Sequence, residues 1–307
     1  MNKKRWFSIV LCLFLTIKTK DTAFAHEPLW GESAQTFAFN IWHPEIRFGF
    51  TNADSLFANG KKVANPDNMR MTRLEGLFSL QYAPKTALNV KIEVPFAHVS
   101  NQQKINGTLQ KSNSTGLGDI VLSAKTRFNE RFGEDWKLHQ ALTAGLQLPT
   151  GTHNAKMPNG ELLLPSEQAG SGKWGVLLGY SIAYERLQDI TWFSIHYQAD
   201  FGGSGRRGAR WQADLTYGYW FVRSKRPEDT GFILGVGFHI ESIGRDRLAN
   251  GSAINSGYNL LGWQTNFIVT KGQSQFRVGV LVPLDKRVNG TQLFPEWQIR
   301  AGWEILL

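Results

Sequence analysis

The sequence has 307 residues, of which 42% are hydrophobic, 12% aromatic and 19% charged, with 31 glycines, 11 tryptophans and one cysteine. Such a chain is too apolar for disorder, and a single cysteine supplies no disulfide framework. The mean hydropathy is −0.28, and beyond the N-terminus no apolar run approaches the roughly 18 residues of a spanning helix. A helical membrane protein is excluded, while two globular domains or one large all-β unit both fit the length.

The N-terminus has the three parts of a secretory signal peptide. Residues 1–5 include three basic side chains, residues 6–17 are mostly apolar, and residues 23–25 read Ala-Phe-Ala directly before His26. This order predicts a signal peptide over residues 1–25, cleaved before His26. An amphipathic or buried helix is the alternative, because the approach to the cleavage site is unusually charged.

Removal of the leader changes the charge and the redox chemistry of the chain. The full sequence has 34 basic and 25 acidic residues and a formal charge of +9; five basic and one acidic residue leave with the leader, so +5 remains. Nucleic-acid binding thereby loses its main support, and we expect no nucleic-acid partner. Cys12 also lies in the leader, so we expect the mature chain to have no thiol chemistry.

From residue 70 onward, apolar and polar residues alternate, which is the pattern of a strand with two different faces. Between residues 87 and 96 the apolar face is Leu88, Val90, Ile92, Val94 and Phe96, and the polar face is Asn89, Lys91 and Glu93. Together with a first strand near residues 45–51, twelve such segments are counted. They run to about 10–14 residues, longer than most soluble strands but suited to a tilted membrane crossing.

The apolar faces are rich in aromatic residues near the segment ends, and the opposite faces carry whole charges. This distribution favours a lipid-facing band around a polar lumen, with a secreted β-sandwich as the alternative. We therefore predict an all-β fold, a transmembrane antiparallel up-and-down β-barrel of about 12 strands over residues 45–307.

The connections alternate between short and long. Short polar turns are expected at residues 83–86, 129–135, 186–189, 223–230 and 271–274, and long links at 52–68, 97–118, 150–173, 202–209, 242–256 and 285–293. Outer-membrane barrels have short periplasmic turns and longer outer loops, so both termini are predicted to be periplasmic.

The last residues, 297–307, alternate up to Leu307 and resemble the C-terminal assembly signal of outer-membrane barrels, although an aromatic residue usually stands last. This resemblance implies the barrel-assembly machinery as a partner. The glycine-rich segment 202–208 is interpreted as an outer loop whose arginines meet lipopolysaccharide phosphates, rather than as a phosphate-binding loop, because no βαβ context surrounds it.

A twelve-stranded barrel leaves a lumen roughly 10–12 Å wide once side chains are subtracted. The charged side chains expected to line it have both signs. This wall is either a polar conduit or a set of salt bridges that fill the barrel. The candidate lumen-lining residues are Arg73, Glu75, Lys91, Glu93, Asp119, Lys125, Arg127, Lys137, Glu185, Asp200, Asp214, Glu241, Arg277, Arg300 and Glu304.

Residues 26–44 lack the alternation and are interpreted as a periplasmic lead-in or an inward plug, with the lead-in favoured. A free His26 could chelate Cu(II) or Ni(II) through its amine and imidazole, yet a lone N-terminal histidine is weak support, and no metal or other cofactor is predicted. Ser194 and His196 share one strand face as a hydrolase pair would. They lack an orienting third residue, so no enzyme is predicted.

Two short motifs carry a family resemblance. Thr115-Gly116-Leu117-Gly118-Asp119-Ile120 opens one strand, and Leu148-Pro149-Thr150-Gly151 ends the next. With the glycine and aromatic alternation that follows, the chain resembles the outer-membrane proteins of the MetA-pathway of phenol degradation family, usually called transporters. The resemblance implies uptake or export of small molecules, including aromatic compounds. The start His26-Glu-Pro-Leu-Trp-Gly is similar to that of barrel proteins associated with metal-efflux systems.

We therefore expect a monomeric channel of the bacterial outer membrane, through which small molecules diffuse passively along a charged lumen narrowed by the links at 97–118 and 150–173. Its expected partners are outer-membrane lipid, lipopolysaccharide and a small-molecule solute. Two other functions remain open at this point: a component of metal handling or efflux that uses the His26 segment, and a structural or adhesion barrel acting through its outer loops.

Overall fold

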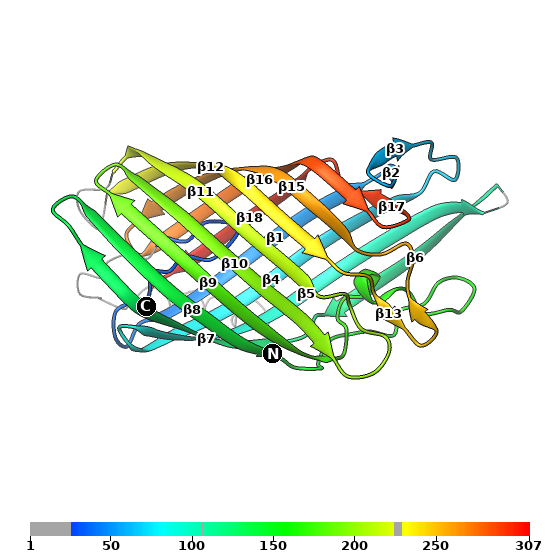
Figure 1. Ribbon diagram of the computed structural model, residues 1–307, viewed down its shortest axis with the longest axis horizontal. Coiled ribbons are helices and arrows are strands. Elements are labelled where there is room, and N and C mark those ends of the chain that lie inside the picture. Colours follow the sequence, from blue (N-terminus) through cyan, green and yellow to red (C-terminus); the bar gives the residue numbers. More distant parts are fainter. Residues whose placement is uncertain (1–25, 106, 224–228) are drawn as a thin grey trace, which may run out of the picture.

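The computed structural model describes residues 26–105, 107–223 and 229–307, which form an all-β barrel (Figure 1). The predicted signal peptide, residues 1–25, lies outside the described residues. No helix in the described part of the chain is long and apolar enough to cross a membrane. The twelve long strands of the barrel are β1 (Trp42–Ala53), β4 (Arg70–Lys85), β5 (Leu88–Ile105), β7 (Val121–Phe132), β8 (Trp136–Gln147), β9 (Trp174–Arg186), β10 (Asp189–Phe201), β11 (Arg210–Val222), β12 (Thr230–Ile243), β15 (Tyr258–Lys271), β16 (Ser274–Val288) and β18 (Gln298–Ile305).

The sheet closes on itself without a free edge. The first strand, β1, pairs antiparallel with the last, β18, and with β4, while β4 pairs with β5 and the remaining neighbours follow in chain order. Closure satisfies the backbone hydrogen bonds of every long strand within the sheet, which is the condition for a sheet to cross a bilayer. The predicted antiparallel up-and-down barrel of twelve strands is confirmed.

The outer surface is an apolar band. Large apolar side chains on the strands point away from the lumen, and Phe48, Phe128 and Leu142 remain 58%, 54% and 54% exposed. Polar side chains occupy the alternate positions and are buried, as Lys125 and Thr143 illustrate. Contact of this outer band with water would be unfavourable, whereas lipid covers it. The closed barrel therefore spans a lipid bilayer.

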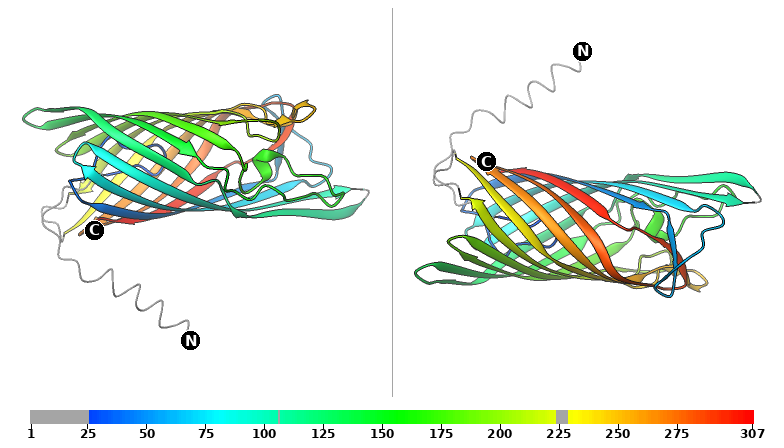
Figure 2. Two further views of the ribbon diagram at one scale, coloured as in Figure 1. Left: turned by 90° about the horizontal axis from the view of Figure 1, so that it is seen from below. Right: turned by 90° about the horizontal axis from the view of Figure 1, so that it is seen from above.

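The connections between strands are short at one end of the barrel and long at the other. The C-terminus lies at the end with the short turns, and the hairpin of β5 with β6 (Thr108–Leu117) projects from the opposite end (Figure 2). The predicted order of short turns and long links agrees with this arrangement. The long links also carry small strands, namely β2 (Ser55–Ala58), β3 (Lys61–Val63), β13 (Arg247–Leu248), β14 (Gly251–Ser252) and β17 (Thr291–Phe294).

The link at 97–118 differs from its prediction as a loop. Strand β5 continues past the barrel rim and pairs with β6 from Phe96↔Leu117 to Lys104↔Leu109. The sequence of this hairpin is polar on both faces, because neither face meets lipid or a packed core. The outer part of β5 and the whole of β6 are therefore strands whose sequence does not alternate between apolar and polar residues.

A pair of leucines tests the membrane position of the barrel. Leu142 lies in the middle of β8 and Leu162 in the loop after it, and their exposed fractions in the absence of lipid are similar, 54% and 58%. Leu142→Arg should lower the free energy of unfolding from lipid vesicles by about 2–4 kcal/mol, because the charge enters hydrocarbon. Leu162→Arg should change it little. Equal effects in urea titrations would contradict the spanning assignment.

Candidate functional site

Residues 26–37, called here the N-terminal segment, lie inside the barrel and belong to no strand. Leu29 and Trp30 are fully buried, and the indole Nε1 of Trp192 donates a hydrogen bond of 2.9 Å to the carbonyl of His26. The sequence favoured a lead-in outside the barrel, whereas the structure places this segment within the lumen. Its lack of alternation reflects contacts with the barrel wall on all sides rather than with two different surroundings.

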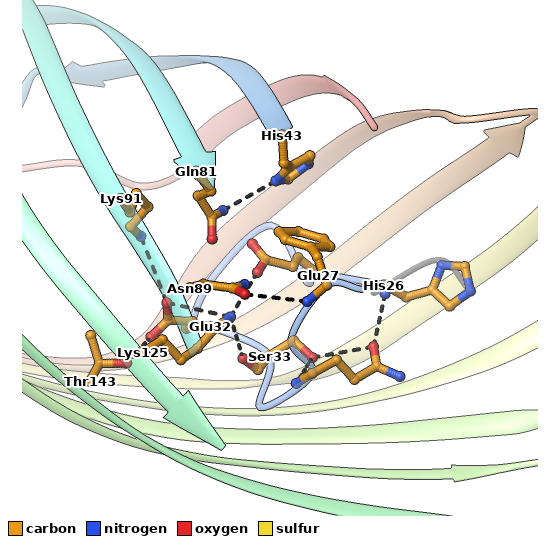
Figure 3. Close-up of polar contacts among 12 residues, drawn as sticks. His26, Glu27, Glu32, Ser33, His43, Gln81, Asn89, Lys91, Lys125 and Thr143 are labelled. Atoms are coloured by element: carbon orange, nitrogen blue, oxygen red, sulfur yellow. Dashed lines mark hydrogen bonds and ion pairs between the residues drawn. The ribbon is translucent and has the colours of Figure 1, made fainter. Parts of the chain in front are cut away.

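Two lysines of the wall hold two glutamates of the segment (Figure 3). The Nζ of Lys125 on β7 lies 3.2 Å from Glu27 Oε1 and 3.7 Å from Glu32 Oε1. The Nζ of Lys91 on β5 lies 3.7 Å from the same oxygen of Glu32, and Thr143 Oγ1 donates to Glu32 Oε2 at 2.8 Å. These ion pairs anchor the segment alongside the apolar packing of Leu29 and Trp30.

Both anchoring glutamates are ionised at neutral pH. Burial alone would raise the pKa of Glu27, but Lys125 and then His43, Lys91 and Arg277 outweigh burial and hold this pKa well below its ordinary value. The pKa of Glu32 is lowered in the same way, with Lys125 and Lys91 overcoming the effect of burial. The charged form of each carboxylate is the stable one, because a lysine ammonium group that is also buried lies beside it and attracts its negative charge.

Arg277 on β16 connects the segment to the seam where the first and last strands meet. Its Nη1 donates to the carbonyls of Glu27 and Pro28, each at 3.1 Å. Its Nη2 contacts the carboxylates of Glu45 on β1 and Glu304 on β18, the latter at 2.6 Å. The carboxylates of Glu27, Glu45 and Glu304 approach one another closely, and the guanidinium of Arg277 supplies the positive charge among them.

Other predicted lumen residues pair along the wall. Glu93 lies 3.2 Å from both Arg47 and Lys91. The Nδ1 of His239 lies 2.7 Å from the Asp214 carboxylate.

Nearer the periplasmic turns, Arg127 lies 2.8 Å from Glu130. Glu185 accepts a hydrogen bond from Gln35 at 3.2 Å, and this contact ties the C-terminal half of the segment to β9. Lys137 shares the inward register of β8 but is exposed beside its turn.

Above the N-terminal segment, the outer half of the lumen holds a cavity of about 540 Å³, called here the vestibule. Its wall includes the predicted residues Arg73, Glu75, Asp200, Glu241 and Arg300. The links expected to narrow the lumen take part, since Gln102 and Lys111 of the β5–β6 hairpin and Leu163 and Glu167 of the loop after β8 line the same cavity.

Two arginines of the vestibule wall form ion pairs with neighbouring glutamates. Arg73 Nε lies 2.6 Å from Glu75, and Arg210 Nε lies 2.8 Å from Glu241, which also accepts a hydrogen bond from the hydroxyl of Tyr258. These pairs fix the positions of long side chains in a cavity wide enough to let them move.

The loop after β8, which contains the short 3₁₀ helix Pro165–Glu167, is held over the vestibule by the side chains of Arg207 and Asp119. The guanidinium of Arg207 donates to the carbonyls of Pro165 and Gln168 at 3.1 and 2.9 Å. Asp119 accepts hydrogen bonds from the backbone of Gly151 at 2.9 Å and of Gly172 at 3.0 Å. Asp119 therefore anchors this loop, whereas the sequence suggested that it lines the lumen.

The sequence missed the residues that complete these pairs. Glu27 and Glu32 lie outside the alternating region, so nothing in the pattern connected them with Lys125. Arg210 lies on the same face of β11 as Gln212 and Asp214, and extending the predicted strand by one residue would have included it. Arg207 lies in a glycine-rich loop, where alternation of residues does not predict the direction of a side chain.

Ser194 and His196, whose spacing on one strand face resembles that of a hydrolase pair, do not contact each other through a hydrogen bond in the described residues. Both point inward, as predicted, but Ser194 Oγ accepts a hydrogen bond from the backbone N–H of Glu32 at 3.1 Å. Ser194 instead supports the N-terminal segment.

His26 is likewise engaged inside the barrel. Its backbone nitrogen donates to Gln35 Oε1 at 2.8 Å, its ring Nδ1 lies 3.3 Å from Gln275 Oε1, and the ring meets Trp220 edge-on. A chelate through amine and imidazole would have to displace these contacts, so the seated segment disfavours metal binding at this position.

The fold and its polar lumen define an outer-membrane β-barrel protein. Residues 47–292 match the family model described as "Putative MetA-pathway of phenol degradation". The chain belongs to this family, as the sequence motifs implied. Among curated protein sequences, none matches the chain.

Solved structures agree with the fold. The crystal structure of the COG4313 outer membrane channel from Pseudomonas putida F1 is 16% identical, with a TM-score of 0.64, and the match covers 89% of this chain and 98% of that one. The β domain of the Bordetella autotransporter BrkA (9% identity, TM-score 0.43, coverage 87% and 99%) and LpxR from Salmonella typhimurium (8%, 0.42, 86% and 99%) are more distant. Of these three, the Pseudomonas structure alone bears on the fold.

Arg277→Met tests the ion pairs at the seam between the first and last strands. The substitution removes the cationic partner that the buried carboxylates of Glu45 and Glu304 share, although Arg47 still lies 3.0 Å from Glu45. The free energy of unfolding should therefore fall by about 3–5 kcal/mol. Arg287→Met on the same strand is the control, because the Arg287 side chain is 78% exposed and should contribute less than about 1 kcal/mol. Urea titration followed by gel mobility measures both, and equal losses would contradict the assignment.

The anchoring glutamates predict a pH dependence. A lowered folded-state pKa stabilises the folded protein fully above the ordinary value of 4.5, and this contribution declines as the pH falls from there toward the lowered pKa. The double variant Glu27→Gln, Glu32→Gln should therefore be less stable than the wild type at pH 7. The difference should shrink below pH 4.5. A difference that is constant with pH would show that the two carboxylates do not act through their charge.

Proposed function

We propose that this barrel is a passive channel for small molecules, in which the vestibule receives the solute and the N-terminal segment closes the periplasmic half of the lumen at rest. One observation carries the proposal: a segment outside the sheet, rather than the barrel wall itself, occupies the lumen below the vestibule.

The vestibule has the size and lining of a small-molecule site. Its volume of about 540 Å³ lies within the range of pockets that take small ligands. Charged side chains of both signs share its wall with the apolar side chains of Leu163, Met157 and Phe294. Solutes that combine polar and apolar parts match this wall better than bare ions do.

The N-terminal segment can leave its place without breaking the barrel. Its polar contacts with the wall are ion pairs and side-chain hydrogen bonds, such as those of Lys125 and Arg277. Leu29 and Trp30 also pack on apolar side chains of the wall, and no residue of the segment contributes to the strand ladder. The cost of release is therefore that of separating buried charges and exposing Leu29 and Trp30, while the sheet stays closed. This is the requirement for a gate that has two discrete states.

Family membership supports small solutes, since the family description refers to phenol degradation. The similar Pseudomonas structure is that of an outer membrane channel. Aromatic compounds are therefore among the solutes that we propose.

Lys125→Gln tests the proposed gate. The substitution removes the wall charge that is paired with both Glu27 and Glu32, so the seated state should lose about 3 kcal/mol relative to the released state. The fraction of time that single channels spend open in planar bilayers should rise roughly a hundredfold, because an equilibrium constant changes tenfold for about every 1.4 kcal/mol. Deletion of residues 26–37 should leave the channel open throughout.

Lys137→Gln is the matched control. It also removes one lysine of inward register, but this lysine is exposed at the periplasmic turn, and its loss should leave the open fraction unchanged. If neither Lys125→Gln nor the deletion gives conductance, the barrel is no channel, and a structural or adhesion role through the outer loops is the better account.

A further inference from the structure

Arg300 on β18 brings an unpaired positive charge to the vestibule. Its side chain lines the cavity and is half-buried. The guanidinium carbon lies 5.3 Å from the centre of the Trp30 ring, so the cation rests on the aromatic face at the top of the N-terminal segment. Among the hydrogen bonds and ion pairs of the described residues, none involves the side chain of Arg300.

The carboxylates around Arg300 are already engaged. Glu75 is bound by Arg73 at 2.6 Å, and Glu241 is bound by Arg210 at 2.8 Å. Each of these acids has its own arginine, so Arg300 adds one uncompensated positive charge to this part of the wall.

A glycine stands opposite Arg300 on the neighbouring strand. Gly49 on β1 is in register with Arg300 on one side and with Glu75 on the other. A Cβ atom at Gly49 would lie 3.4 Å from Glu75 Oε2 and 3.8 Å from Arg300 Cγ. Because glycine has no such atom, no side chain of β1 stands between Glu75 and the stem of Arg300.

An apolar wall accompanies the free charge. Leu163, Leu164, Tyr258 and Phe294 line the same cavity as Arg300. A guanidinium presents its donors as a planar fork that matches a carboxylate in a bidentate manner. The combination of the Arg300 guanidinium and an apolar wall suits a molecule with one negative group and an apolar body.

We propose that Arg300, seated on Trp30, forms a binding site for organic monoanions, specifically carboxylates carried on an aromatic or short aliphatic body. The proposal rests on the proposed channel function in that it names the class of solute. Binding itself needs only the vestibule, which lies outside the seated segment. Arg73 and Arg210 are neutralised by Glu75 and Glu241, so the group around Arg300 keeps a net charge of one positive, which a monoanion matches.

Calorimetric titration of the purified full-length mature protein in detergent tests the site, with benzoate as the probe and benzyl alcohol as its neutral analogue. Wild-type protein should bind benzoate at least roughly tenfold more tightly than benzyl alcohol, because a hydrogen bond to a charged group distinguishes the two. Arg300→Gln should remove this preference, and Arg300→Lys should keep part of it, since it retains the charge without the fork.

Arg287→Gln is the control, because it removes an exposed arginine near the outer end of β16 and should leave benzoate affinity unchanged. Heat-modifiable gel mobility confirms that each variant is folded. Benzoate binding that survives Arg300→Gln, equal binding of the two probes, or no binding by the wild type would overturn the proposal. A protein that binds benzoate but does not conduct would refute the channel and leave this site intact.

Discussion

The pairing of Lys91 and Lys125 with Glu27 and Glu32 is the interaction on which the organisation of the lumen depends. A barrel that turns charged side chains inward must neutralise them in a narrow space, where unpaired buried charges are costly. The wall supplies two lysines, and a segment from outside the sheet supplies the two carboxylates. The same ion pairs therefore satisfy the wall and hold the segment in place.

This pairing divides the lumen into two parts with different chemistry. In the periplasmic part, Arg277 binds both the carbonyls of the segment and the carboxylates at the seam where the first and last strands meet. One guanidinium therefore stabilises both the position of the segment and the closure of the sheet. In the outer part, ion pairs line an open vestibule whose floor is Arg300 on Trp30. The segment thus provides both a closure for the lower lumen and an aromatic support for the charge above it.

Most of the barrel could be predicted from the sequence because a strand's two faces are a local property. The alternation from Leu88 to Phe96 indicated a strand and the inward direction of Lys91, whatever its partners. The partners themselves were not predictable, since Glu27 and Lys125 are 98 residues apart and meet only when the barrel closes. The β5–β6 hairpin was missed for the opposite reason, because its two faces have the same polar surroundings and leave no alternation to read.

Locking the N-terminal segment in place tests the central claim most directly. Ala34 belongs to the same buried cluster as Ala141 on the wall, and the sequence's single cysteine, Cys12, lies in the predicted leader. In an Ala34→Cys, Ala141→Cys variant carrying Lys125→Gln, a reductant-cleavable thiol crosslinker should abolish single-channel openings, and reductant should restore them. Openings of unchanged size and frequency in the crosslinked protein would contradict a gate formed by residues 26–37.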